Sequence, residues 1–600
     1  MADAVSFVLL GAMYAALGRL VLARLAVEIR GLEAFAWSVG LGTGVGSCFL
    51  FAWLAVAGGG GATASLIALG AFVGAWILWD RLSPPPARPS ASPRARFDAW
   101  AIPPLAGCAV LLVASLAPEV GWDAIAYHLP AAARAGRDGL GPMPGLLDAE
   151  YRLGFDLLFV PGLVLDGRIP RGPAFLSALA ATALVSGVYA EARRRTSSPL
   201  ACAVATLLLG VPTFASEATT AGVDVGVGLY GFLAFAAVAR ALRGESGRGV
   251  LAAGLFAGFA AAAKLPALVY VPAAALGLAV GLPRGERARS AWTALAVGTL
   301  VTVPWFIRAW VDMGQPFFPL FASTLGSGWA DPNVVRLASD GILDQTGLPR
   351  GLGRGIAGVA WVARDAVRGG PTLFALAALA VAGVARPSTR ERRGLFAAAA
   401  VALVAWAWFL PIPRLGFALV AWLAIAAAAG LARLAPRATA ARTVAVSLLL
   451  AACVVAFLRG RPIASRVGAS FADDRGAEKF AYEEAGERFG QAEFAAGLPR
   501  PIGLGLSSPA YVGLDAVSLQ AMRNGIVANE DWEDPERLLR SLRRLGLRSV
   551  VLPEDGASDL APTIARALEA RGATAVRRYG RNESVWWQVT LPTAPSPSPR

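Results

Sequence analysis

Runs of mostly apolar residues divide this chain, and they constrain its fold more than any other feature. About fourteen of them approach or reach the roughly 17–25 residues that a helix needs to cross a bilayer. Of the 600 residues, 56% are hydrophobic and 16% are charged, whereas about 25% of a soluble domain is charged. The sequence therefore predicts an α-helical polytopic protein of about 12–14 transmembrane helices in a lipid bilayer. The expected spans are 4–22, 33–57, 62–80, 99–117, 172–191, 199–215, 222–240, 249–264, 265–282, 290–309, 371–386, 394–411, 413–432 and 441–458.

Clusters of arginine between these runs predict the orientation of the chain. With the spans above, every cluster falls on one side of the membrane, which the positive-inside rule assigns to the cytoplasm. Both termini are then expected outside. The formal charge of +14 is explained by these short loops, and a dispersed pattern of this kind argues against a nucleic-acid partner.

The polar segments predict the division of the chain into parts. Two long outer loops are expected at 118–170 and 311–370, and the composition shifts to charged, soluble sequence after Arg459. In that last region 502–506, 549–552 and 585–591 are typical of strands, and 534–545 and 559–571 of amphipathic helices. We expect three leading helices in 1–80, a Pro/Arg-rich cytoplasmic linker in 81–98, a transmembrane catalytic module in 99–458, a small extracytoplasmic α/β domain in 459–591 and a disordered tail in 592–600.

Ionisable residues inside the predicted spans or near their ends are costly and often functional, and besides the arginine clusters five of them stand out. In the predicted topology all five lie at the outer ends of their spans. This convergence predicts one charged site at the outer membrane–water boundary. The five are Asp123, Asp224, Lys264, Arg308 and Arg414.

Each of these residues also has a structural alternative. Asp123, beside Trp122, could act as a general base or could cap a helix. A lysine or arginine at the end of a span could bind a phosphate. Alternatively, its apolar stem could lie in the membrane while its charged group reaches the membrane–water interface. For Asp224 we expect pairing with Lys264 or an arginine rather than catalysis.

The stretch around Asp123 also contains the single histidine of the chain, His128. Tyr127 is four residues after Asp123, so a helix would place both on one face. His128 is expected to fix the loop or to contact the acceptor. The four cysteines are dispersed in apolar runs without metal-ligand spacing, so the sequence indicates neither a metal site nor a cofactor.

Several motifs together resemble the bacterial GT-C membrane glycosyltransferases, in particular the group similar to protein O-mannosyltransferases and to the lipid A aminoarabinose transferase. The resemblance covers roughly residues 99–435. The motifs are Trp122-Asp123-x-x-x-Tyr127-His128-Leu129-Pro130, Val223-Asp224, Lys264 at the end of a run of small residues, Pro304-Trp305-x-x-Arg308 with Gly314-x-Pro316-x-x-Pro319, and Pro411-Ile412-Pro413-Arg414. Where many relatives have Asp-Glu, this chain has Asp123-Ala124.

This resemblance implies an enzyme of the bacterial inner membrane with an extracytoplasmic site. It would transfer a sugar from a polyprenyl-phosphate donor to an acceptor hydroxyl, with inversion and with Asp123 as the base. Cationic side chains would stabilise the leaving lipid phosphate. The sugar stays open, and so does the acceptor, which could be a lipid, a glycan or a protein. The implied substrate-binding residues are Tyr127, His128, Asp224, Lys264, Arg308 and Arg414.

Two other functions fit a polytopic chain of this kind. A transporter or flippase for lipid-linked glycans would place its charges along a path near the bilayer midplane, whereas the predicted charges collect at one boundary. A glycan ligase or polymerase would favour an outer loop richer in Arg and His than 118–170.

Overall fold

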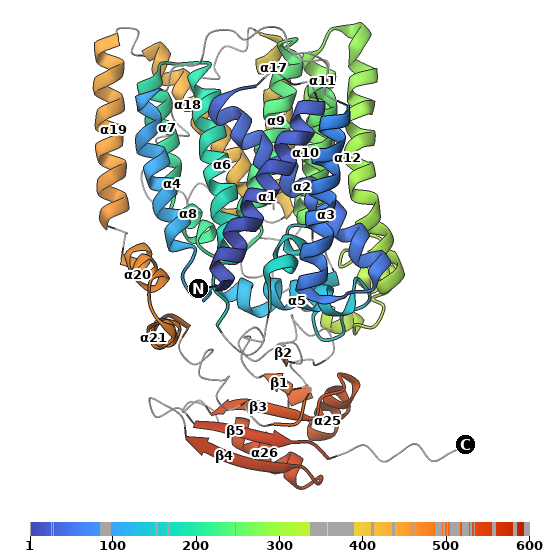
Figure 1. The fold of residues 1–600 in the computed structure, drawn as a ribbon. Coiled ribbons are helices and arrows are strands. Elements are labelled where there is room, and N and C mark those ends of the chain that lie inside the picture. Colours follow the sequence, from blue (N-terminus) through green and yellow to red (C-terminus); the bar gives the residue numbers. More distant parts are fainter. Residues whose placement is uncertain are drawn as a thin grey trace.

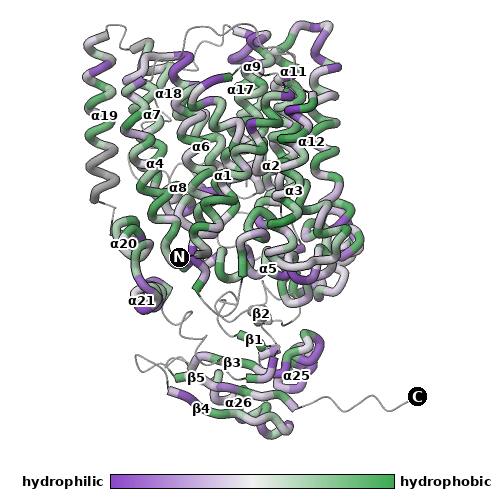
Figure 2. Tube along the Cα trace, viewed as in Figure 1, coloured by the Kyte–Doolittle hydropathy of each residue, from purple (hydrophilic) through white to green (hydrophobic). Residues whose placement is uncertain are grey.

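The computed structural model of the chain is a helical bundle with a small sheet domain at one end (Figure 1). Hydrophobic residues fill the middle of the bundle, and hydrophilic residues gather toward its two ends (Figure 2). The structure describes residues 2–592 apart from 26, 28, 84–97, 151–153, 165–168, 246–247, 336–356, 358–388, 410–412, 435–437, 459–460, 486–494, 496–497, 501, 505–515, 519–526, 528–530, 533, 555–559 and 580–584.

Thirteen of the fourteen predicted spans contain a helix, which confirms the helical membrane-protein fold class. The span 371–386 lies outside the described residues, as do most of the loop 311–370, most of the linker 81–98 and residues 593–600. The helices are α1 (Ala2–Arg24), α2 (Gly31–Ala57), α3 (Gly61–Leu82), α4 (Ile102–Ala114), α6 (Ala174–Arg193), α7 (Ser198–Leu209), α9 (Asp224–Leu242), α10 (Gly249–Ala263), α11 (Tyr270–Gly281), α12 (Arg284–Met313), α17 (Arg390–Phe409), α18 (Phe417–Leu434) and α19 (Ala438–Leu458).

Helix length varies widely within this bundle. Among the described residues, six helices are long and apolar enough to cross a membrane: α1, α2, α3, α6, α9 and α12. Others are much shorter. A helix of twelve residues, such as α7 or α11, is only about 18 Å long. The 3₁₀ turns η1 (Ala99–Ala101) and η5 (Leu265–Val269) directly precede α4 and α11 and lengthen these two helical segments.

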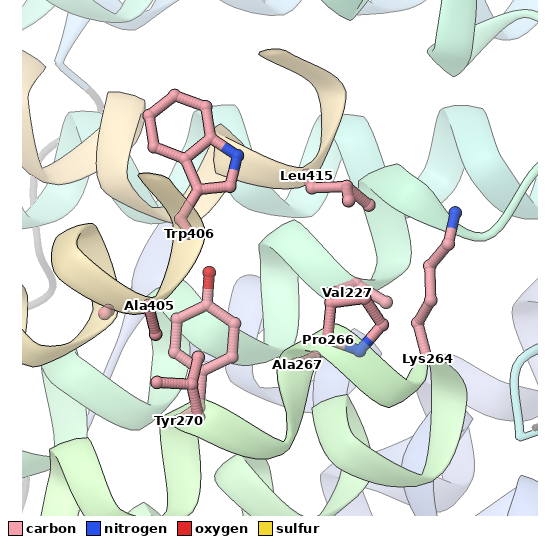
Figure 3. A pocket seen from close by; sticks show the side chains of 10 residues that line it. Val227, Lys264, Pro266, Ala267, Tyr270, Ala405, Trp406 and Leu415 are labelled. Carbon is pink, nitrogen blue, oxygen red and sulfur yellow. The ribbon is translucent and has the colours of Figure 1, made fainter. Parts of the chain in front are cut away.

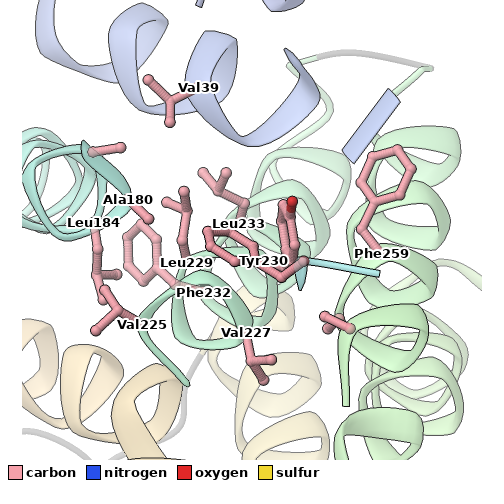
Figure 4. Packing of buried hydrophobic residues seen from close by; sticks show 14 of the residues in the cluster. Val39, Ala180, Leu184, Val225, Val227, Leu229, Tyr230, Phe232, Leu233 and Phe259 are labelled. Atoms are coloured by element: carbon pink, nitrogen blue, oxygen red, sulfur yellow. The ribbon is translucent and has the colours of Figure 1, made fainter. Parts of the chain in front are cut away.

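Helix α9 forms the centre of the bundle. Nearly all of its residues are buried, and it packs against α6, α10, α11, α17 and α18. Figure 4 shows its side chains Tyr230 and Phe232 among buried residues of neighbouring helices, including Val39, Leu184 and Phe259. Because Asp224 is the first residue of α9, this packing holds its carboxylate at a fixed place at one end of the bundle.

An ion-pair network joins the helices at the opposite end. Arg240 Nη1 lies 2.8 Å from Glu33 Oε1, and Arg243 Nη1 lies 2.7 Å from Glu391 Oε1. These pairs connect α2, α9 and α17. The arginines of this end therefore hold the bundle together through buried and half-buried carboxylates.

The C-terminal region forms the small α/β domain predicted from the sequence. In the described part of this domain, five strands form a sheet in the order β2-β1-β3-β5-β4: β1 (Ile502–Leu504), β2 (Ala516–Ser518), β3 (Ser549–Glu554), β4 (Thr574–Tyr579) and β5 (Val585–Thr590). Strand β1 is parallel to β2 and β3, and β5 is antiparallel to β3 and β4. Helices α25 (Pro535–Arg544) and α26 (Leu560–Glu569) supply the apolar side chains that pack on the sheet.

Two helices not expected from the sequence, α20 (Arg461–Ser470) and α21 (Asp474–Ala485), connect the bundle to this domain. Ser470 Oγ donates to the carbonyl of Val113 at 2.7 Å, near the end of α4. Arg171 donates from Nη1 to the carbonyl of Ala472 at 2.9 Å and from Nη2 to that of Asp473 at 3.0 Å. These bonds fix the start of the C-terminal region against the end of the bundle that carries Asp224.

Candidate active site

Arg414 is the centre of a charged network at the end of the bundle where α9 begins. It lies in the 3₁₀ turn η6 (Pro413–Gly416) between α17 and α18. Its Nη1 is 2.7 Å from Asp123 Oδ2 and 3.3 Å from Glu217 Oε1, and its Nε is 3.2 Å from Asp224 Oδ2. One guanidinium therefore joins three carboxylates that come from three separate segments of the chain.

Lys264 extends this network by one more ion pair. Its Nζ lies 2.5 Å from Asp224 Oδ1, so the two oxygens of Asp224 contact two different cations. Lys264 follows the last residue of α10 in an extended conformation, with φ −152° and ψ 132°. Asp224 itself is at the N-terminus of α9, where the helix dipole favours a negative charge. The carboxylate of Asp224 therefore serves as the bridge between Arg414 and Lys264.

Asp123 enters the network from the loop that follows α4. The next five residues form a π-helical turn, η2 (Ala124–His128), an irregular geometry that is frequent at functional sites. Asp123 makes no side-chain capping bond to this turn. Its carboxylate is directed to Arg414 instead, and its side chain is 16% exposed. The structure therefore shows no capping bond from the Asp123 side chain, and the catalytic role of Asp123 stays a prediction.

Glu217 is the residue of the site that the sequence reasoning did not identify. It lies in the short helix α8 (Pro212–Ala218), between the apolar run that ends near 215 and the one that begins near 222. Glu217 lies closer to the end of a predicted span than Asp123 does, so the criterion that selected Asp123 could have found it. Burial and the neighbouring Asp224 raise the pKa of Glu217 to about 7, against the opposing effects of Arg414 and Lys264.

Glu119 ties together the two loops that carry the acids of the site. Its side chain is buried, at 1% exposure. Oε1 accepts the backbone N–H of Gly121 at 2.7 Å, and Oε2 accepts that of Ala221 at 2.6 Å. Burial raises the pKa of Glu119, although Arg466 and the backbone donors oppose this effect. The segment before Asp123 and the segment before Asp224 are thereby held at a fixed separation.

Tyr127 and His128 are the last two residues of the turn that follows Asp123, and their side chains have different partners. His128 Nδ1 is 2.7 Å from Asp156 Oδ1, and both side chains are buried. Burial raises the pKa of Asp156, and His128 opposes the shift. The tyrosine ring is 4.2 Å from the imidazole between centroids, and Tyr127 lies close enough to Arg414 to affect it electrostatically. His128 thus anchors the loop, while Tyr127 borders the network.

Arg308 lies in a second cluster with partners of its own. It donates from Nε to the carbonyl of Leu140 at 2.9 Å and from Nη1 to that of Ala149 at 2.7 Å. Its Nη2 is 3.1 Å from Glu150 Oε2. These contacts fix the loop 140–150. Among the described contacts Arg308 does not join the network of Arg414, and its phosphate contact stays a prediction.

An apolar pocket lies beside Lys264 (Figure 3). Lys264 is the charged member of its lining, and Tyr270 and Trp406 border it with aromatic rings (Figure 3). The remaining lining residues are Val227, Pro266, Ala267, Val269, Ala402, Ala405 and Leu415. A ligand with an anionic group and an apolar body could therefore meet a cation and a hydrophobic surface at adjoining places. Among the described residues, no group of three or more His, Cys, Asp or Glu side chains could hold a metal ion.

Comparison with known proteins identifies relatives of the central part of the chain. Residues 167–308 match the sequence model of the dolichyl-phosphate-mannose-protein mannosyltransferase family, which confirms the resemblance predicted from the motifs. That segment contains Asp224, Lys264 and Arg308, but not Asp123 or Arg414.

Solved structures of ArnT from Cupriavidus metallidurans, bound to undecaprenyl phosphate and in the apo state, are 17% identical to this chain. The matches cover 82% of this chain and 98% and 97% of those chains, with TM-scores of 0.46 and 0.49. No curated protein matches the chain.

Proposed function

We propose that this chain is a membrane glycosyltransferase that transfers a sugar from a polyprenyl-phosphate donor to an acceptor hydroxyl at the outer face of a bacterial inner membrane. One observation carries the proposal: the network Asp123–Arg414–Asp224–Lys264 adjoins an apolar pocket. A carboxylate, two cations and a hydrophobic surface are the groups that this reaction requires. The family matched by residues 167–308 is named for a dolichyl-phosphate sugar, which is a donor of this class.

The reaction assigns a role to each part of the site. Asp123 accepts the proton of the acceptor hydroxyl, whose oxygen attacks the anomeric carbon from the face opposite the phosphate. The bond between that carbon and the phosphate oxygen breaks, and its electron pair goes to the phosphate. Lys264 and Arg414 stabilise the charge that develops there. The anomeric configuration is inverted because attack and departure occur on opposite faces.

The position of the charged residues around Arg414 favours sugar transfer over transport of a lipid-linked glycan. A transporter of lipid-linked glycans would hold its charged groups along a path near the bilayer midplane. The Arg414 network instead lies where α9 begins and α10 ends, at the end of the bundle next to the C-terminal domain (Figure 1). A group at that boundary can meet both a lipid-linked donor and an acceptor outside the membrane.

Sugar transfer by isolated membranes tests the proposal. Membranes that contain the protein are incubated with a panel of radiolabelled polyprenyl-phosphate sugars and with extracts of envelope lipids, glycans and proteins. We expect label transfer from one donor, and its loss by a factor on the order of 100 or more in Asp123→Asn. Asp138→Asn is the matched control, because that aspartate is 53% exposed and pairs with Arg137. Full activity of Asp123→Asn would contradict the role of Asp123, and no transfer from any donor would contradict the enzyme class.

The orientation can be tested separately with a reporter enzyme fused to the C-terminus of the full chain. The C-terminal region is bonded to the end of the bundle that carries the site. A reporter that works only in the extracytoplasmic space should therefore be active. If a reporter that works only in the cytoplasm is active instead, the site lies on the wrong side of the membrane for this function.

A further inference from the structure

The network around Arg414 contains more negative than positive groups. Asp123, Glu217 and Asp224 supply three carboxylates, whereas Arg414 and Lys264 supply two cations. With all five ionised, the network has one negative charge in excess. The donor of the proposed function is a phosphodiester, which is itself a monoanion. Such a ligand would meet two cations that are already neutralised.

The three carboxylates are not held equally firmly. Asp224 contacts both cations, at 2.5 Å and 3.2 Å, and Asp123 contacts Arg414 at 2.7 Å. Among the described residues, Glu217 has one ion-pair contact, to Arg414 at 3.3 Å. A close opposite charge favours the ionised form of a carboxyl group. Glu217 is therefore the carboxylate whose protonation would cost the network least.

We propose that Glu217 takes up a proton when the site binds the phosphodiester of the donor, so that donor binding and proton uptake are coupled at this residue. The inference rests on the proposed function. Protonation of Glu217 leaves two carboxylates and two cations, a neutral network into which a monoanion can enter without excess repulsion. Glu217 is then a positioning residue that leaves Arg414 and Lys264 available to the phosphate.

The surroundings of Glu217 support this coupling. Helix α8 packs against α6, α7, α9 and η6. The charged groups that face it are Asp224 from α9 and Arg414 from η6, with further contributions from Lys264 and Asp123. Helix α7 has no ionisable side chain other than the thiol of Cys202, and those of α6 lie at its far end. Because the pKa of Glu217 is about 7 without a ligand, a nearby anion would raise it further and favour the protonated form at neutral pH.

The thermodynamic linkage between proton binding and ligand binding determines how the affinity for the phosphodiester changes with pH. A ligand that raises the pKa of one group by one unit binds tenfold more tightly to the protonated protein than to the ionised protein. Binding of a phosphodiester should therefore be tight below pH 6 and should weaken as the pH rises through 7. Above the pKa of the bound state the affinity should become constant again.

The test measures binding of undecaprenyl methyl phosphate to the full chain in nanodiscs between pH 5.5 and 8.5. This probe is a phosphodiester, so its own charge does not change over that range. We expect the affinity of the wild type to fall about tenfold across the range. Glu217→Gln should bind at pH 8.5 as tightly as the wild type at pH 5.5, with no pH dependence. Glu483→Gln, on an exposed glutamate of α21 with a 64% exposed side chain, should keep the wild-type profile.

Calorimetry of the wild type provides a second readout that does not depend on any variant. Titrations at pH 7.5 in buffers of different ionisation enthalpy should show net proton uptake on binding. Binding without proton uptake would overturn the proposal, as would an unchanged pH profile in Glu217→Gln or loss of binding in that variant at every pH. Failure of the wild type to bind the probe at any pH would instead contradict the donor site of the proposed function.

Discussion

The guanidinium of Arg414 lies 2.7 Å from the carboxylate of Asp123, although the two residues are in distant parts of the sequence. The same side chain uses its Nε for Asp224, at 3.2 Å. A guanidinium presents several N–H donors in a planar fork, whereas an ammonium group is a point charge. The site therefore depends on the shape of arginine as well as on its charge.

Arg414→Lys tests the importance of that shape. Lysine keeps the positive charge but cannot hold Asp123 and Asp224 with separate N–H groups along two edges of one planar group. We expect the sugar-transfer rate to fall on the order of 100-fold, the usual effect of a misplaced group at a catalytic centre, with normal amounts of folded protein in the membrane. Arg284→Lys, on an exposed arginine at the start of α12, is the control. A wild-type rate in Arg414→Lys would show that charge alone suffices.

Glu119→Gln tests the connection between the two acidic loops. The amide keeps one acceptor oxygen, so one of the bonds to Gly121 and Ala221 is lost and an NH₂ group faces a backbone N–H. We expect a loss of roughly 1–3 kcal/mol in the free energy of unfolding, together with a lower kcat. Thermal unfolding in detergent and transfer kinetics measure the two effects. A variant with wild-type stability and kcat would contradict the positioning role of Glu119.

The pH dependence of stability should differ between the wild type and Glu217→Gln. The pKa of Glu217 is about 7 in the folded protein and 4.5 for an unperturbed glutamate. Between these values the folded state binds more protons than the unfolded state, so the stability of the wild type falls as the pH rises from about 4.5 to 7 and is level above. Glutamine does not titrate, and the variant should be more stable at pH 8 by on the order of 3 kcal/mol. The melting temperatures of both proteins at pH 5 and pH 8 check this prediction. The same difference between variant and wild type at both pH values would contradict it.

Arg308→Gln should release the loop 140–150 without loss of donor binding. The substitution removes the ion pair to Glu150 and at least one of the bonds to the carbonyls of Leu140 and Ala149. We expect faster cleavage of this loop by an added protease, with binding of undecaprenyl methyl phosphate retained. Loss of probe binding with an intact loop would instead support the phosphate contact predicted from the sequence.

The sequence alone predicted the helices of the bundle because membrane insertion depends on local composition. Within the described part of the chain, helices lie in thirteen of the predicted spans, and three of the five strands were expected. The two remaining strands lacked the signal. Strand β1 is as short as β2, but it begins the alternating run Ile502-Gly-Leu-Gly-Leu506, whereas the residues around β2 do not alternate. Strand β4 is exposed along nearly all of its length and also lacks the alternation of apolar residues that indicates a half-buried strand.

The sequence also determined which polar residues are exceptional, because charge at the end of a span is costly wherever it occurs. It also predicted that Asp224 would pair with Lys264 or an arginine, but only the tertiary structure decided the full set of partners. It joined Asp123, Asp224, Lys264 and Arg414 in one network and added Glu217 to it, while Arg308 lies with Glu150 and the loop 140–150. An ion pair depends on distances of a few ångströms between segments far apart in the chain. Those distances are set by how the helices pack, which no local pattern encodes.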